Sequence, residues 1–396
     1  MAPKPLVTQI AIGRFHHFHL ARELEVHGML KEIWSGYPKF KLRDELGIPR
    51  SKIKSFPWLH TPLMLRYKLQ WENNQWLSRE WSWWANDLLD RRVAARLTSP
   101  HVLVALSGSG LAAGSRMRSL GGLYICDRGS THIRVQDHLL QQEYARWGLE
   151  FKGIDPRSIA KEEAEYAACD VLTVPSEFAR RSFLQQGILA EKIVKIPYGA
   201  RLARFHKVGD PPQGRFHLLW VGRVSIQKAF LDALSAFQLL DHPRKEFCVV
   251  GSIEPCVRKL LKSADTCGVR FIGHVPNSEL AQYYSRSHAL VLPSIQEGLA
   301  NVLGEALACG CPIIASPNTG AHDLIVDGEQ GFVVPIHSPA LIAKKLDLLA
   351  TSSKVRQQMS KAAIARVALL EGWSEYGRQY AKLVGRLSAG VMPRLA

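Results

Sequence analysis

Short apolar runs of strand length alternate along the chain with segments in which apolar residues recur every three or four positions. That alternation is typical of α/β proteins, in which helices separate parallel strands. Strands are predicted in LVTQIAI, HVLVALS, GLYICD and DVLTVPS of the first half, and in HLLWVG, FCVVG, VRFIG, ALVLPS, CPIIAS and GFVVP of the second. Helices are predicted over 19–27 and 159–168, among others. The pattern therefore predicts an α/β fold with doubly wound parallel sheets.

A break in this alternation divides the chain near residue 210. The sequence KVGDPPQG at this point has the Pro and Gly content of a linker, and the strand rhythm resumes after it. A chain of 396 residues also exceeds what one hydrophobic core usually holds. We therefore expect an N-terminal domain of residues 1–208, a C-terminal domain of residues 209–371, and a further helix within residues 372–396.

Composition and charge narrow the class of protein. Apolar residues make up 46% of the chain and charged residues 22%, which excludes a disordered or fibrous protein. The 51 Lys and Arg outnumber the 35 Asp and Glu, so the formal net charge is +16. That surplus favours an anionic partner: nucleic acid, a nucleotide-type small molecule or an acidic membrane surface. The seven cysteines form no C-x-x-C pair, so a reducing compartment is expected.

Some features bear on membranes. No run of about 18 apolar residues occurs and the first residues lack a secretory pattern, so we expect a cytoplasmic protein, soluble or peripheral on the inner membrane face. Six of the ten tryptophans lie between Trp58 and Trp84, where Leu77, Trp81, Trp84 and Leu88 recur at helical spacing. Two interpretations stay open: a helix packed on its own domain, or a surface that meets lipid headgroups.

The most informative segment is ALVLPSIQEGLANVLGEALACGCPIIAS, residues 289–316. It predicts a strand, a loop holding Glu297 and Gly298, a helix from about Leu299 to Ala308, and a second strand. A helix N-terminus at the carboxyl edge of a sheet attracts phosphate. Glu297 and Glu305 would lie roughly 12 Å apart along the helix, too far for a glycosidase pair. They either bind different parts of one elongated ligand or are ordinary helix carboxylates.

A second candidate phosphate site follows the predicted strand HLLWVG. Gly222 ends the strand, and Arg223 and Lys228 follow within the next six residues. Glycine lets the backbone approach a ligand, and the two cations would neutralise a pyrophosphate leaving group. Alone, two such cations are equally well explained as solvated surface charges.

Together these motifs resemble the retaining glycosyltransferases of family 4, the group 1 glycosyltransferases with the GT-B fold. The resemblance rests on GR-x4-K, on FIGHVPNSELAQYYSRSHALVLPS, on EGLANVLGEALACGCPIIAS and on DGEQGFVVP in the second half. The first half matches more loosely, through EYAACDVLTVPSEFARRSF and IVKIPYGARLARF. The resemblance implies two Rossmann-like domains facing across a cleft, the first binding acceptor and the second donor, with the final helix crossing back onto the first domain.

The resemblance also assigns the donor site. It implies that Glu297 contacts the hydroxyls of the donor sugar, that Arg223 and Lys228 bind the diphosphate, and that Glu305 holds the nucleotide ribose. The other donor-binding positions that it implies are Gly222, His274, Val275, Gly298, Leu299 and Ala300. This chain has Ala229 after the lysine where many members have glycine, and Asp323 where glutamate is common.

Two loops of the first half are expected to form the acceptor side of the cleft. One is IGRFHHFHLARELEVHG, in which Gly13, Arg14 and His16 replace the paired glycines common in the family. The other is CDRGSTH, where the resemblance makes His132 the cleft histidine that contacts the transferred sugar. There Asp127, Arg128 and Ser130 would position acceptor or phosphate. A loop histidine without a ligand is the alternative.

These observations predict transfer of a hexosyl unit from a nucleotide-diphosphate sugar to a glycan or lipid-linked acceptor, with retention of configuration. The implied front-face displacement uses the departing phosphate as proton acceptor and needs no dedicated base. No D-x-D motif is present, so neither a metal nor a cofactor is expected. A GT-B sugar-nucleotide epimerase and a basic nucleic-acid-binding protein are the alternatives, although no helix-turn-helix, zinc-finger or RNP motif favours nucleic acid.

Overall fold

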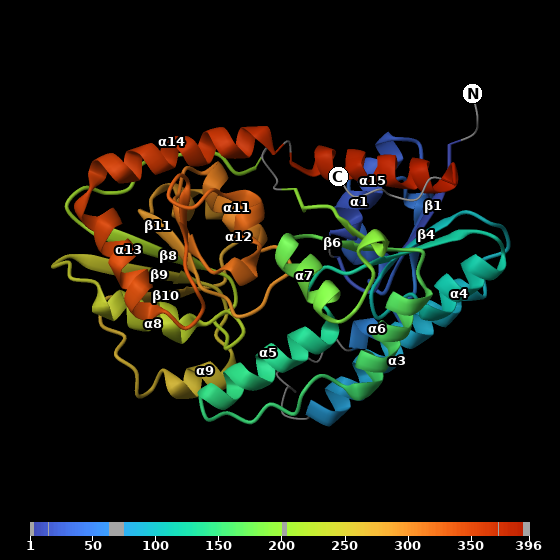
Figure 1. The fold of residues 1–396 in the computed structure, drawn as a ribbon, viewed down its shortest axis with the longest axis horizontal. Helices are drawn as coiled ribbons and strands as arrows, with labels where there is room; N and C mark the ends of the chain where they lie inside the picture. The colour runs from blue at the N-terminus through green and yellow to red at the C-terminus, as the bar shows by residue number, and fades with distance from the viewer. Residues whose placement is uncertain (1–3, 15, 63–74, 200–203, 371, 391–396) are drawn as a thin grey trace.

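The computed structural model describes the whole chain except residues 1–3, 15, 63–74, 200–203, 371 and 391–396 (Figure 1). Within the described residues, two parallel sheets form two α/β bodies that lie side by side, with helices on both faces of each sheet (Figure 1). The predicted fold class, two Rossmann-like domains, is therefore confirmed.

The first sheet has seven parallel strands in the order β3-β2-β1-β4-β5-β6-β7. These strands are β1 Val7–Ala11, β2 Leu30–Ser35, β3 Ile53–Ser55, β4 Val102–Leu106, β5 Leu123–Asp127, β6 Val171–Val174 and β7 Ile193–Lys195. Its helices are α1 His17–Val26, α3 Gln75–Ala94, α4 Leu111–Ser119, α5 Ile133–Arg146, α6 Pro156–Ala168 and α7 Glu177–Gln185. Short 3₁₀ helices occupy Lys39–Leu42, Arg50–Lys52 and Ala190–Lys192.

The second sheet has six parallel strands in the order β10-β9-β8-β11-β12-β13. They are β8 Phe216–Val221, β9 Lys245–Val250, β10 Val269–Gly273, β11 Ala289–Leu292, β12 Ile313–Ala315 and β13 Gly331–Val333. The accompanying helices are α8 Phe230–Leu239, α9 Pro255–Leu260, α10 Leu280–Ser285, α11 Asn301–Ala308, α12 Ala321–Leu324, α13 Pro339–Thr351 and α14 Ser353–Leu369, with a 3₁₀ helix at Pro317–Thr319.

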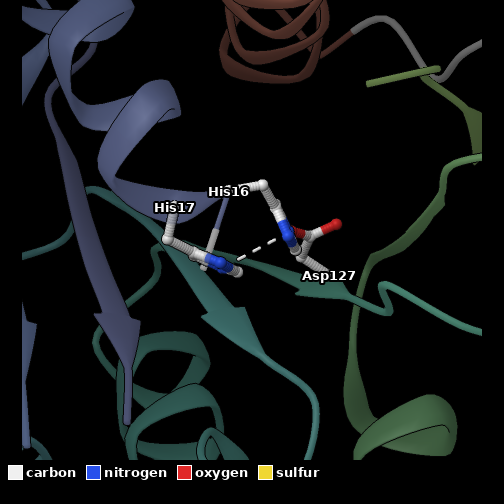
Figure 2. Close-up of side chains that lie close together, drawn as sticks. All are labelled: His16, His17 and Asp127. Atoms are coloured by element: carbon white, nitrogen blue, oxygen red, sulfur yellow. Dashed lines mark hydrogen bonds and ion pairs between the residues drawn. The ribbon is translucent and has the colours of Figure 1, made fainter. Parts of the chain in front are cut away.

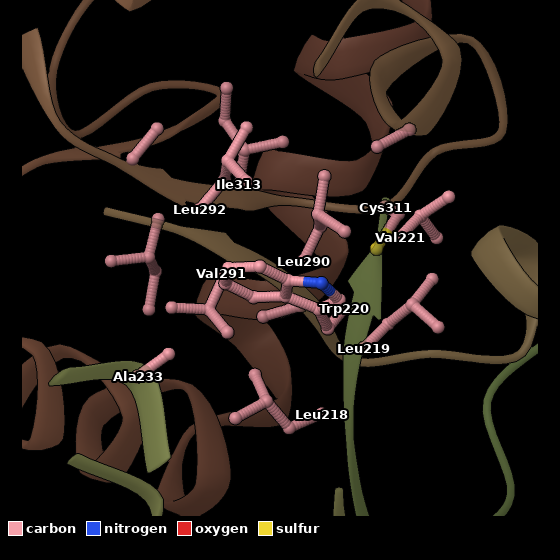
Figure 3. Close-up of a cluster of buried hydrophobic side chains, with 14 of the residues drawn as sticks. Leu218, Leu219, Trp220, Val221, Ala233, Leu290, Val291, Leu292, Cys311 and Ile313 are labelled. Carbon is pink, nitrogen blue, oxygen red and sulfur yellow. The ribbon is translucent and has the colours of Figure 1, made fainter. Parts of the chain in front are cut away.

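Continuous apolar runs place the inner strands of the second sheet in its core. Strands β8 and β11 read FHLLWV and ALVL, and Trp220 and Leu290 between them are fully buried (Figure 3). Strands covered by helices on both faces are expected to be apolar at every position rather than at alternate ones. All ten strands predicted from such runs are present.

The final helix, α15 Gly372–Ser388, leaves the second body and crosses onto the first, as expected (Figure 1). Tyr376, Tyr380, Leu383, Val384 and Leu387 repeat along one face of α15 and are buried in the core that also holds residues of α1 and β1. Spacings of three and four residues bring these side chains onto one helical face. The helix thus contributes to the core of the domain that begins the chain.

A second contact between the bodies is made by α5, whose C-terminal end reaches α8 of the second domain. Arg146 of α5 pairs with both carboxylate oxygens of the buried Asp232 on α8, at 2.6 and 2.8 Å. Beside this pair, His337 Nε2 lies 2.5 Å from Glu143, also on α5. Two charge-assisted contacts between exposed cationic or imidazole side chains and buried carboxylates therefore fix one end of α5 on the second domain.

The tryptophan-rich segment forms helix α3, whose buried face consists of Ala85, Leu89 and Val93. Leu77, Trp84 and Leu88, on the apolar face for which two interpretations were left open, are exposed, so these three side chains do not pack in the core. Trp71 lies outside the described residues. No helix in the described part of the chain is long and apolar enough to cross a membrane.

Candidate functional site

A cleft of about 570 Å³ opens between the carboxyl ends of the two sheets. In each sheet the strand order reverses next to it: β1 and β4 are neighbours in the first sheet, and β8 and β11 in the second. Loops that leave such neighbouring strands in opposite directions create the ligand crevice of open α/β sheets. The lining residues include Arg14, His16, Ser107, Arg128, Gly129, Ser130, Tyr198, Glu297, Gly298, Leu299, Asn301 and Trp373.

The two walls of the cleft touch at Gly298. Its carbonyl oxygen accepts a hydrogen bond of 2.5 Å from Ser176 Oγ of the first domain. A Cβ atom at residue 298 would lie 2.0 Å from the carbonyl oxygen of Gly129, so only glycine fits this approach. Next to it, the Gln296 amide donates to Ser130 Oγ at 2.6 Å. Backbone packing and hydrogen bonds therefore hold the loops after β5 and β11 together.

The cations predicted to bind diphosphate follow β8 and already have carboxylate partners. Lys228 forms an ion pair with Glu297, and Ser294 Oγ donates to the same carboxylate at 3.4 Å. Gly222 lies beside the Lys228 stem, where a Cβ would come within 3.7 Å of Cε. Arg223 is more exposed and lies 3.4 Å from Glu254. Two cations thus stand at the end of β8, one of them joined to the loop that opens α11.

Backbone N–H groups in front of α11 provide neutral donors. Among the described residues, no group accepts a hydrogen bond from the N–H of Gly298 or Leu299. The N–H of Ala300 instead donates to the carbonyl of Thr319 at 3.0 Å, and donor binding by Ala300 stays a prediction. The helix begins at Asn301 rather than Leu299, with Ala300 in an extended conformation. The positive end of the helix dipole faces the cleft through these groups.

The remaining donor positions lie farther along the second domain. Tyr284 donates from its hydroxyl to Glu305 Oε2 at 2.9 Å, which fixes this carboxylate on α11. His274 is exposed after β10. Val275 is buried in the hydrophobic core, so its side chain does not face a ligand. Ala229 has φ 53° and ψ 43° at the start of α8, a left-handed conformation that explains why glycine suits this position.

On the first domain, Asp127 at the end of β5 lies under the His16 ring (Figure 2). His16 Nε2 lies 2.5 Å and His17 Nε2 3.4 Å from Asp127 Oδ2. Burial alone would raise the pKa of Asp127, but the charge and hydrogen bond of His16 outweigh it and lower that pKa to about 2. Burial, reinforced by His16, lowers the pKa of His17 to about 3. Asp127 is therefore ionised and His17 neutral near pH 7.

The next residue, Arg128, is held by its own domain. Its guanidinium pairs with Glu162 at 2.8 Å and donates to Ser107, Gln136 and the carbonyl of Thr131. These contacts fix the side chain while it lines the cleft. Arg14 also lines the cleft, and its ion pair with Glu45 holds it there. Gly13 is buried at the end of β1.

His132, the predicted cleft histidine, lies at the start of α5. Its side chain is the N-cap of α5, where Nδ1 accepts from the N–H of Arg134 at 3.2 Å. The ring packs against Tyr166 and Phe183, each with its centroid 5.1 Å away. Burial lowers its pKa to about 4. The residue is 3% exposed and caps α5, and its contact with the transferred sugar stays a prediction.

Comparison with known proteins agrees with this geometry. The sequence profile of the family described as "Glycosyl transferases group 1" matches residues 203–366. Over those residues the chain is similar to the group 1 glycosyltransferases. The match covers the whole second sheet, including both segments that carry Lys228 and Glu297.

Among curated relatives, the D-inositol 3-phosphate glycosyltransferase of Frankia alni is 31% identical over 211 residues, covering 48% of this chain and 51% of the relative. The capsular polysaccharide biosynthesis glycosyltransferase CapM of Staphylococcus aureus is 25% identical over 226 residues, covering 52% and 58%. The chain thus spans about half the length of these relatives.

Solved structures show the fold over nearly the whole chain. Sucrose-phosphate synthase from Thermosynechococcus elongatus superposes with a TM-score of 0.67 at 18% identity, covering 98% of this chain and all of that one. Anabaena HepE in complex with UDP and glucose gives a TM-score of 0.68 at 14% identity, covering 97% and 100%. The segment that matches the group 1 profile therefore forms the second half of a GT-B fold.

Two clusters in the described part of this GT-B chain bring three potential metal ligands within 4.8 Å: His16, His17 and Asp127, and Glu143, Asp232 and His337. In the first, His16 and Asp127 are directly hydrogen-bonded, which leaves no gap for an ion between them. In the second, Arg146 already neutralises Asp232. Neither cluster is assigned as a metal site, and metal independence stays a prediction.

Several cleft residues of the GT-B fold were missed by sequence reasoning. Tyr198 stacks on His16 with ring centroids 4.4 Å apart, and Trp373 stacks on His19 at 4.0 Å. Both residues lie in segments that join the two domains. The sequence predicts no strand end at these positions, so it gave no reason to place them in the cleft. The segment IVKIPYGARLARF around Tyr198 had been noted, but nothing in its pattern shows that the tyrosine faces β5.

Proposed function

We propose that the protein transfers a hexosyl unit from a nucleotide-diphosphate sugar to a hydroxyl of a glycan or glycolipid acceptor, with retention of configuration. The observation that carries this proposal is the wall formed by the second domain. There Lys228 and Arg223 follow β8, while the unpartnered N–H groups of Gly298 and Leu299 precede α11. Cations and backbone donors on adjoining loops are what a diphosphate requires.

The same residues supply the chemistry of the departing group. When the bond between the sugar and the phosphate breaks, negative charge grows on the diphosphate, and fixed cations stabilise it most where water is excluded. Lys228 would exchange Glu297 for phosphate, which frees the Glu297 carboxylate to accept hydrogen bonds from sugar hydroxyls. The Lys228–Glu297 ion pair thus holds both side chains ready before the donor arrives.

The donor and pathway are proposed from the relatives. One of the superposable structures is a complex with UDP and glucose, which supports a nucleotide-hexose donor. The name of CapM supports a role in polysaccharide or cell-envelope glycan biosynthesis. We expect no metal or cofactor requirement, and dialysis against EDTA should leave transfer unchanged.

Attachment to an anionic membrane surface is proposed for the first domain. Residues 1–100 contain 16 Lys and Arg against 9 Asp and Glu, and Trp58 and Trp84 are 76% and 51% exposed. Basic and aromatic side chains together favour an interface with anionic headgroups. In flotation assays, binding to vesicles with phosphatidylglycerol should exceed binding to phosphatidylcholine vesicles and should weaken with salt. Equal binding to both would contradict the proposal.

The decisive test of transfer compares Lys228→Ala with Lys361→Ala, an exposed lysine on α14 outside the cleft. A thermal-shift panel of UDP-, GDP- and ADP-sugars first identifies the donor, because a ligand of the folded state raises the Tm. Lys228→Ala should then lose at least about 10²-fold in turnover, whereas Lys361→Ala should match the wild type. Product NMR reports the anomeric configuration. Wild-type turnover by Lys228→Ala, or no nucleotide-dependent shift, would overturn the proposed site.

A further inference from the structure

A pocket of about 310 Å³ lies on the second domain, at the edge of the sheet opposite to the cleft. Its lining includes Arg215, Arg244 and Arg270, which stand at or beside the first residues of β8, β9 and β10. The cleft lies at the carboxyl ends of the strands, and a strand of typical length spans roughly 17 to 20 Å. The pocket is therefore separate from the proposed donor site.

The topology of the sheet brings these arginines together although they are far apart in the sequence. Strands β10, β9 and β8 are consecutive neighbours at one side of the sheet, and neighbouring strands lie about 4.8 Å apart. The register pairs Phe216 with Lys245, and the N–H of Phe216 donates to the carbonyl of Arg244 at 2.8 Å. Arg215, one residue before β8, therefore lies beside Arg244, one residue before β9. Like charges in such neighbouring positions repel each other and destabilise a sheet.

One carboxylate serves two of the arginines. Glu246 Oε2 lies 3.3 Å from Nη1 of Arg215, and its Oε1 lies 3.3 Å from Nη1 of Arg270. The Glu246 side chain is 16% exposed, whereas the two arginine side chains are 54% and 63% exposed, so the carboxylate lies beneath both guanidinium groups and fixes their positions. Each guanidinium has five N–H donors, and the donors that Glu246 does not use face outward to a ligand.

The third arginine, Arg244, forms no ion pair with a carboxylate of the described residues. Its guanidinium lies against the backbone before β8, where a Cβ at Gly214 would come within 3.1 Å of Nη2. Lys245 supplies no counter-charge, because its Nζ is a further cation and donates to three backbone carbonyl groups at the end of α8. Three guanidinium groups thus line the pocket with one carboxylate, which leaves a surplus of two positive charges.

We propose that the pocket formed by Arg215, Arg244, Arg270 and Glu246 binds a phosphate group, carried by a lipid headgroup or by a soluble phosphate ester. Planar guanidinium groups present paired N–H donors that match phosphate oxygens, and a bound anion would offset the repulsion between the neighbouring arginines. A volume of about 310 Å³ lies at the lower end of the range for small-molecule sites. The inference is independent of the proposed transfer reaction.

Isothermal titration calorimetry with inorganic phosphate, at constant ionic strength, measures this binding on the full chain. The parent protein carries Arg223→Ala and Lys228→Ala, because these two cations are proposed to bind phosphate in the cleft. Adding Arg244→Ala should weaken phosphate binding about 10-fold or more, the effect of losing one hydrogen bond to a charged group. Arg258→Ala, which removes an exposed arginine on α9 of the same domain, is the matched control and should bind phosphate as the parent does.

Vesicle sedimentation distinguishes the two sources of phosphate. If the phosphate belongs to a lipid headgroup, Arg244→Ala should bind phosphatidylglycerol vesicles less than Arg258→Ala does. Equal sedimentation of the two variants, together with weakened phosphate binding by Arg244→Ala, identifies a soluble phosphate ester. Turnover on a soluble acceptor should be unchanged in Arg244→Ala, because the pocket lies outside the cleft. If the parent protein fails to fold by circular dichroism, the same substitutions are compared in the wild type, where the cleft contributes equally to every titration.

Two results would overturn the inference. Phosphate binding by Arg244→Ala as tight as that by Arg258→Ala would show that the arginines of the pocket are solvated surface charges. Absence of phosphate binding by the parent protein would show that the pocket takes no such anion. Neither result bears on the proposed transfer, which Lys228→Ala tests in the cleft, so the two proposals fail separately.

Discussion

Gly298 joins the two walls of the cleft, so replacing it by alanine should separate them. The glycine has no positive φ, and its backbone conformation therefore accepts an alanine without strain. The obstacle is the other domain: a Cβ at residue 298 would lie 2.0 Å from the oxygen and 2.7 Å from the carbon of the Gly129 carbonyl. Real Cβ atoms essentially never come within 3.0 Å of another atom, and a backbone carbonyl has no rotamer to which it can move.

The loops after β5 and β11 must therefore move apart by about 1 Å or more in Gly298→Ala. The hydrogen bond from Ser176 to the Gly298 carbonyl, at 2.5 Å, would lengthen with them. A displacement of ~1 Å between reacting groups costs about 10²-fold in rate. We expect kcat to fall by about that factor, because Arg128 and Glu297, which line the cleft, lie on the two loops that this contact joins.

Gly385→Ala is the matched control. Gly385 lies on α15, and a Cβ there would meet no atom within 4 Å. Alanine in a helix interior is favoured over glycine by about 1 kcal/mol, so this variant should keep wild-type turnover with an equal or higher Tm. Both variants would be assayed for nucleoside diphosphate release and by thermal unfolding. Wild-type turnover in Gly298→Ala would refute the inference that a closed backbone contact at this point is needed for catalysis.

Two further predictions concern stability. Asp232→Ala leaves the Arg146 guanidinium without its main partner. We expect the free energy of unfolding to fall by roughly 2 kcal/mol, less than for a fully buried pair because Arg146 is partly exposed. Thermal unfolding should show a lower Tm, and an unchanged Tm would contradict a stabilising role for the α5 contact. Glu165 is buried, and burial raises its pKa to about 8 despite hydrogen bonds from the N–H groups of Gly110 and Gly108. Because the folded-state pKa exceeds the unfolded one, this residue's contribution to stability is full below about pH 4.5 and declines as pH rises through about 8. Between pH 5 and 8 the Tm of Glu165→Gln should therefore fall less than the Tm of the wild type. Parallel plots of Tm against pH for the two proteins would refute the raised pKa of Glu165.

The strands that sequence could predict are those whose residues are apolar without interruption. Strand β2 reads LKEIWS and lies near an edge of its sheet, with the adjoining β3 only three residues long. Both were missed, as was the short edge strand β7, because partly solvated strands lack the continuous apolar run. The buried face of α3 could not be chosen from the sequence for a related reason: spacing alone does not say which of two apolar stripes on a helix meets the core.

The residues proposed to bind the donor could be chosen from local sequence, because the cations, glycines and helix start concerned lie in two short segments of one domain. The acceptor side did not. His16 and Asp127 are 111 residues apart and meet only because β1 and β5 end at the same edge of the sheet. His132 follows the expected strand, yet the turn into α5 directs its ring into the core. Side-chain direction in a loop and the sharing of backbone hydrogen bonds, as at Ala300, are set by tertiary packing.

The course of α15 bears on how the protein is made. Five buried side chains of α15 complete the core of the first sheet, yet they are translated after every strand of both sheets. Domains generally fold as units while the chain emerges from the ribosome. Here the second domain has all its strands available before the first can close its core. The apolar surface around α1 therefore stays exposed through most of synthesis. Chaperones that cover such surface would act on the N-terminal domain, which is synthesised first but completes its core last.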